Sequence, residues 1–179
     1  MKKRGVEGVT FGALRWQGEP MFDTVLGLPV HALVVHAVVV LVPLSALGVA
    51  AISVAPRWRV PFGPLVLAVT TAGLVMVPVA TNSGEQLEDR IDAGGIVKEQ
   101  IEDHVMWGER VLWPTVALWV LTVALVVLAR RPRPGRVVTL VAVLAVVAAV
   151  ASAGAVVLTG HLGSTAVWSC TIGSDVCSD

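Results

Sequence analysis

The chain has 179 residues, of which 55% are hydrophobic and 15% are charged, and its formal net charge is zero. Its mean hydropathy of +0.80 lies outside the range of soluble domains. Because there is no excess of basic residues, the composition predicts no nucleic-acid partner. The sequence is therefore that of an integral membrane protein in contact with a lipid bilayer.

The first twenty residues precede the apolar sequence and carry several basic side chains. They lack the apolar h-region that follows the basic residues of a signal peptide. We expect residues 1–20 to be a disordered extension or a mis-assigned start, with translation beginning at Met21. No function is predicted for them.

Four uncharged apolar runs follow, and each is long enough to cross a bilayer as a helix. They lie at residues 30–55, 64–81, 111–129 and 137–158. The runs are continuous rather than alternating, which predicts helices and not the strands of a barrel. Residues 21–168 are predicted to form one all-α transmembrane domain, a four-helix bundle, and residues 169–179 a tail.

The charges indicate how this bundle is oriented. Both short connections between spans, residues 56–62 and 130–136, carry arginines and no acid, whereas residues 82–110 carry eight acidic and three basic side chains. By the positive-inside rule the arginine-rich connections face the cytoplasm. The acidic segment and both termini are then predicted on the outer side of a bacterial cytoplasmic membrane.

The acidic segment has the pattern of amphipathic helices. Ser83 followed by Gln86 fits a capping box, which predicts that a new helix starts there. A second amphipathic helix is expected over residues 96–110, running into the third span. Both are predicted to lie along the outer membrane surface.

Both cysteines, Cys170 and Cys177, fall in the tail. In an oxidising compartment they are candidates for a small disulfide loop, with two free thiols as the alternative. The tail holds no further ligands for a zinc site.

All four histidines of the chain are predicted at the outer side, where a buried imidazole costs free energy unless something binds it. His31 and His36 are five residues apart in the first span, so they differ by roughly 140° in direction and cannot easily bind one ion together. We expect His36, the deeper one, to point into the bundle. There it would meet His104 or His161, with His31 in support.

Two imidazoles from facing helices are the arrangement that holds haem b in a helical bundle. One alternative is a transition-metal site in which His104 and its acidic neighbours, Glu102, Asp103 or Glu85, join other histidines. Another is a non-redox scaffold, in which the histidines are structural and the acidic segment docks a partner protein.

The inner half of the bundle has no histidine, so haem groups near both faces are not expected. Any haem would serve an outer-face reaction or a redox partner on that side. Nucleophile triads and phosphate-binding loops are absent, which argues against a hydrolase and leaves open whether the protein is an enzyme.

Three motifs in order, GLPVHALVVHAVVVLVPLSALG, SGEQLED with IEDHVMWGER, and TGHLGSTAVW, resemble the DUF2231 family of four-helix bacterial membrane proteins. The resemblance covers nearly everything from Met21 to Trp168 and implies the same fold. It implies that the family's histidine motifs fall on the four histidines and its last glycine on Gly160 or Gly163. The family has no settled activity, but its association with cytochrome-like and Rieske modules implies redox work.

Overall fold

The structure is a computed structural model that describes residues 24–25, 28–88, 95–130 and 135–168. The expectations for residues 1–20 and for Cys170 and Cys177 lie outside these ranges. Two short strands, β1 (Thr24–Val25) and β2 (Leu28–Pro29), pair antiparallel before the first helix. The helices are α1 (Val30–Val54), η1 (Pro56–Trp58), α2 (Arg59–Glu88), α3 (Gly95–Arg110), α4 (Leu112–Leu128) and α5 (Arg136–Trp168).

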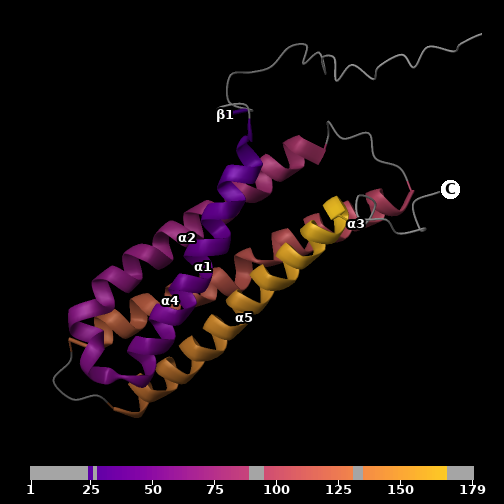
Figure 1. The fold of residues 1–179 in the computed structure, drawn as a ribbon. Coiled ribbons are helices and arrows are strands. Elements are labelled where there is room, and N and C mark those ends of the chain that lie inside the picture. The colour runs from indigo at the N-terminus through magenta and orange to yellow at the C-terminus, as the bar shows by residue number, and fades with distance from the viewer. Residues whose placement is uncertain (1–23, 26–27, 89–94, 131–134, 169–179) are drawn as a thin grey trace, which may run out of the picture.

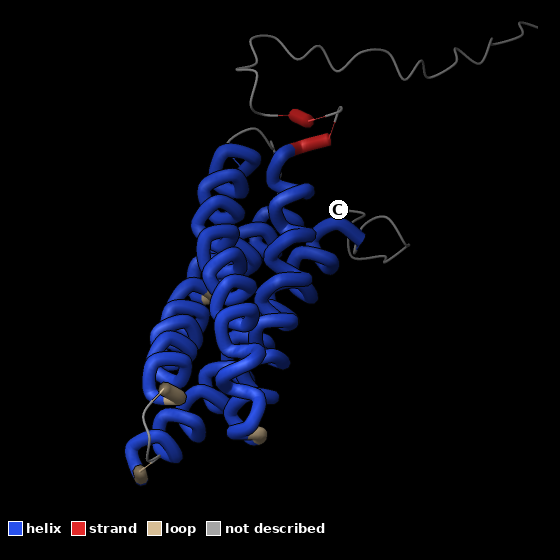
Figure 2. The backbone as a smooth tube through the Cα atoms, turned by 90° about the vertical axis from the view of Figure 1, so that its left-hand side faces the viewer, coloured by secondary structure: helices blue, strands red, loops and turns tan. Residues whose placement is uncertain are grey.

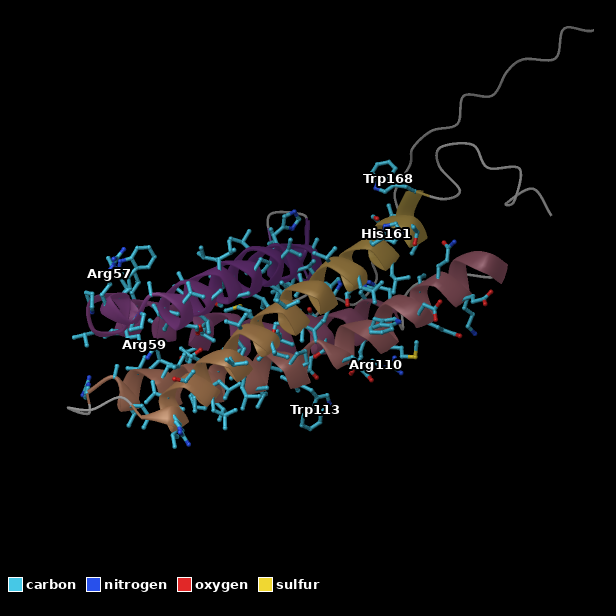
Figure 3. All side chains as sticks on the ribbon, turned by 90° about the horizontal axis from the view of Figure 1, so that it is seen from below. Arg57, Arg59, Arg110, Trp113, His161 and Trp168 are labelled. Atoms are coloured by element: carbon cyan, nitrogen blue, oxygen red, sulfur yellow. The ribbon has the colours of Figure 1, made fainter. Side chains whose placement is uncertain are left out.

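The predicted all-α bundle is confirmed, because four helical stretches are long and apolar enough to cross a membrane. In the elongated bundle, α1 and α4 each pack against both α2 and α5 (Figures 1 and 2). The arginine end, which carries Arg57, Arg59, Arg130 and Arg136, is opposite the histidine end, where α1 and α3 begin and α2 and α5 finish. Figure 3 labels Arg57 and Arg59 at one end and His161 and Trp168 at the other.

The apolar helices α1, α2, α4 and α5 each bury a narrow stripe and expose a broad apolar face, as expected for a bundle in lipid. On α1 the buried stripe runs from Val38 through Val42 and Val49 to Ile52, while Leu44 and Leu47 are exposed. The stripe of α5 consists mainly of alanines, which let neighbouring helices approach closely. Buried hydroxyls bond back to their own helix, as Thr122 Oγ1 does to the Leu118 carbonyl at 2.7 Å.

The helix start predicted at Ser83 is wrong, because α2 continues without a break from Arg59 to Glu88. The Ser83 hydroxyl donates to the carbonyl of Ala80, three residues earlier, at 3.0 Å. A serine hydroxyl that bonds back into the preceding turn of a continuing helix is not available to cap a new one.

The acidic helix α3 packs against α5 instead of standing apart from the bundle. Only Val111 separates α3 from α4, so the expected continuation into the third span is found. The helix α3 can pack on α5 because α5 has 33 residues, about 50 Å of helix, and extends well beyond its apolar run. The position of α3 is therefore set by its packing on α5, and its location along the outer membrane surface stays a prediction.

At the arginine end, Arg59 fastens α2 to the last turn of α1. Its side chain is only 8% exposed. Nε donates to the Ile52 carbonyl at 2.9 Å and a terminal guanidinium nitrogen to the Ser53 carbonyl at 2.8 Å. These carbonyls belong to the end of α1, where no helical partner remains for them.

We expect Arg59→Met to lower the free energy of unfolding by about 2 kcal/mol or more, because it removes two charge-assisted hydrogen bonds and leaves buried carbonyls unpaired. Thermal unfolding in detergent measures the effect. Arg57→Met, which changes an exposed arginine two residues away, is the control, with an expected change within about 0.5 kcal/mol. Equal unfolding temperatures for the two variants would contradict the fastening role of Arg59.

Candidate ligand site at the histidine end

His31 lies in the first turn of α1 and is held by α2. Its Nδ1 is 3.0 Å from the Ala80 carbonyl oxygen and 3.2 Å from Ser83 Oγ. A carbonyl oxygen can only accept a hydrogen bond, so Nδ1 carries the proton. In the neutral ring Nε2 then keeps its lone pair.

His104 lies in α3 and is held by α5 in the same way. Its Nδ1 donates to the Thr159 carbonyl oxygen at 2.9 Å. Here too the accepting carbonyl fixes the proton on Nδ1 and leaves Nε2 as the basic nitrogen of the neutral ring. The two histidines therefore have the same tautomer, imposed by backbone atoms of a neighbouring helix.

Each of these rings lies directly against a glycine. A Cβ built on Gly84 would stand 3.0 Å from His31 Cε1, and one built on Gly163 would stand 2.8 Å from His104 Cε1. No real side chain tolerates the second distance without movement. Glycine is therefore needed at Gly163 for the ring of His104 to reach the Thr159 carbonyl, and Gly84 supports His31 similarly.

Next to these residues, on the side toward the arginine end, four buried valines pack together. They come from α1, α2, the junction of α3 with α4, and α5. We call them the valine layer: Val38, Val77, Val111 and Val156. Seven residues from each of these valines, toward the histidine end, lie His31, Gly84, His104 and Gly163, which we call the histidine layer. His31 and His104 belong to different helices of this layer, α1 and α3. The histidine layer thus contains two imidazoles and lies next to the apolar valine layer.

The other two histidines are on the exposed surface. His36, which was expected to point into the bundle, is exposed, and its Nδ1 donates to the Ala32 carbonyl of its own helix. The reason is the offset of about 140° from His31, which already occupies the core stripe. His161 is also exposed, at the far end of α5 (Figure 3). The structure thus places His31 and His104 in the histidine layer and leaves His36 and His161 outside it.

The carboxylates considered as metal ligands do not join these histidines. Glu85, Glu102 and Asp103 are all exposed. Within residues 24–25, 28–88, 95–130 and 135–168, no group of three or more His, Cys, Asp or Glu side chains is arranged to hold a metal ion. The donor set of the described site therefore consists of two imidazoles.

The sequence reasoning missed the residues that hold the two rings, namely Ala80, Ser83, Gly84 and Thr159. Thr159 has a second distinctive feature, because its buried hydroxyl has no hydrogen-bond partner among the described residues. One signal was present in the sequence. His31 and His104 each precede a valine of the buried stripe, Val38 or Val111, by one heptad, whereas His36 is out of phase with that stripe.

No curated protein and no solved structure matches this chain. A family model described as "Predicted membrane protein (DUF2231)" matches residues 27–176, which include the whole histidine layer. The resemblance seen in the sequence motifs is thereby confirmed, and the chain belongs to the DUF2231 family of predicted membrane proteins.

Proposed function

We propose that this protein binds one haem b between His31 and His104 and serves as a redox or binding accessory in a membrane. The observation that carries the proposal is the hydrogen bond from each Nδ1 to a backbone carbonyl, at 3.0 Å to Ala80 and 2.9 Å to Thr159. Histidines that bind iron or another metal through Nε2 almost always donate their other ring N–H in this manner.

This hydrogen bonding does two things for a ligand. It fixes the tautomer, so that Nε2 offers its lone pair, and it makes that nitrogen more basic. It also lowers the entropy cost of binding, because both rings are already oriented before a ligand arrives.

The size of the donor set favours haem over a bare metal ion. Structural zinc takes four protein ligands and catalytic zinc three, whereas the described site offers two imidazoles. Haem brings four nitrogens of its own, so two histidines complete the coordination of its iron. The valine layer beneath them supplies the apolar surroundings that a porphyrin ring requires.

The position of the site suggests on which side of the membrane it works. The arginine end, with Arg57, Arg59, Arg130 and Arg136, would face the cytoplasm by the positive-inside rule. The histidine layer would then lie beneath the outer surface of a bacterial cytoplasmic membrane, with both termini on that side. One haem at one end does not span the bilayer, so it would exchange electrons with a partner at the outer face.

A visible spectrum of the detergent-purified protein tests the proposal. After expression with added haem precursor, we expect one haem per chain, with a Soret band that shifts on reduction with dithionite. A colourless preparation that cannot be reconstituted with haemin would refute haem binding. Elemental analysis of that preparation then separates a metal-ion site from the scaffold that docks a partner protein.

A further inference from the structure

The two halves of the bundle bury equivalent positions. Among the buried positions of α1, Ser53 has a buried counterpart 73 residues later, Val126, whereas the counterpart of Ala46 is the half-buried Trp119. Val38, Val42, Ser45, Val49 and Ile52 also have buried counterparts at this offset. The counterparts are Val111, Thr115, Leu118, Thr122 and Leu125. Four of the five are unlike residues, so the correspondence is one of register and not of sequence.

The returning helices show the same correspondence with a second constant offset. The buried positions of α2 are Arg59, Gly63, Val66, Thr70, Gly73 and Val77. Their counterparts 79 residues later are Val138, Ala142, Ala145, Ala149, Ser152 and Val156, which are all buried on α5. The offset is 73 for α1, which runs from the histidine end to the arginine end, and 79 for α2, which runs back. The connection between α4 and α5 is therefore six residues longer than the connection between α1 and α2.

The histidine layer obeys both offsets. His31 and His104 are 73 residues apart, and Gly84 and Gly163 are 79 apart. The acceptors of the two Nδ1 protons, the carbonyls of Ala80 and Thr159, are also 79 apart. In each half, therefore, the histidine on the helix that leaves the histidine end lies against a glycine on the helix that returns to it. Its Nδ1 donates to the backbone carbonyl of the residue one turn before that glycine.

Both halves run from the histidine end to the arginine end and back, so they are parallel repeats. Such repeats are related by a pseudo-two-fold axis along the membrane normal. Under this relation α1 corresponds to α3 with α4, and α2 corresponds to α5. The helices that carry the two histidines occupy opposite corners of the bundle, since α1 packs mainly on α2 and α5 and only slightly on α4.

We infer that the chain is a tandem repeat of one helical hairpin and that His31 and His104 are equivalent ligands, one for each face of a single haem. This inference rests on the proposed function and specifies its coordination. Two histidine ligands from the protein would leave the iron of a bound haem no open site for carbon monoxide or oxygen. A haem held by His31 and His104 would supply one-electron chemistry, which would suit exchange with a one-electron redox protein.

The halves differ in one neighbour of the ligands. Ser83, which precedes Gly84, gives the His31 proton a second acceptor, whereas its counterpart before Gly163 is Leu162. One additional neutral hydrogen bond changes an equilibrium constant by only about two- to tenfold. We therefore expect similar but not identical contributions from the two histidines to haem affinity.

Carbon monoxide tests the coordination independently of haem binding. The dithionite-reduced wild-type protein should keep its spectrum on mixing with carbon monoxide. His31→Ala and His104→Ala should each give a carbon-monoxide spectrum in whatever haem they retain, and added imidazole should suppress both responses. A prompt response of the wild type, or of only one variant, overturns the inference but leaves haem binding intact. A wild-type protein without haem refutes the proposed function instead.

Discussion

Replacing either His31 or His104 with alanine is expected to weaken haem binding at least about 100-fold, because each variant would lose one of the two proposed iron ligands. Removal of a residue that only hydrogen-bonds to a ligand already costs about 10–100-fold. His36→Ala and His161→Ala should leave the affinity within about twofold, since both rings are exposed and lie outside the histidine layer. From the sequence alone, His36 was the residue expected to matter most. The structure exposes His36 and places His31 and His104 in the histidine layer, so the order of effects expected here is the reverse.

Haemin titration of the four purified variants, followed by the Soret band, measures these affinities. The thermal unfolding of each apoprotein shows whether the variant still folds. If His36→Ala lost haem and His31→Ala kept it, the site would lie on the exposed face of α1, and the assignment made from the hydrogen bonds would be wrong.

Gly163→Ala is expected to lower haem affinity about 10–100-fold without touching a ligand atom. The new methyl group would stand 2.8 Å from His104 Cε1 and 2.9 Å from Nδ1. The ring must therefore turn or withdraw, and it loses its 2.9 Å hydrogen bond to the Thr159 carbonyl. A ligand that relies on the orientation of this ring loses part of its binding free energy.

The matched control is Gly160→Ala, three residues earlier on α5, where a Cβ meets no atom within 4 Å. Alanine is the better helix former by about 1 kcal/mol, so neither change weakens α5 by propensity. Haemin titration should separate the two variants, and Gly84→Ala, with a 3.0 Å contact to His31, should fall between them. Equal affinities for Gly163→Ala and Gly160→Ala would show that His104 is not held by this contact.

The sequence by itself determined the architecture. Four uncharged runs of at least 18 residues can satisfy their backbone hydrogen bonds in lipid only as helices, so the number of spans follows from length and hydropathy. The placement of histidines at one end and arginines at the other follows from the positions of these residues relative to the four apolar runs. These properties depend on position along the chain and require no knowledge of which helices touch.

Only the tertiary structure decided which histidines bond to a neighbouring helix and which are exposed. Depth favoured His36 over His31, but the core stripe of α1 is defined by the helices that pack against it, and His31 is in phase with that stripe. The capping pattern at Ser83 failed for a similar reason, since its hydroxyl bonds back to Ala80 beside His31. The repeat was also invisible, because equivalent core positions such as Ser45 and Leu118 share burial and not residue type. Burial is a property of the packed bundle, which is why the chain alone did not reveal the site.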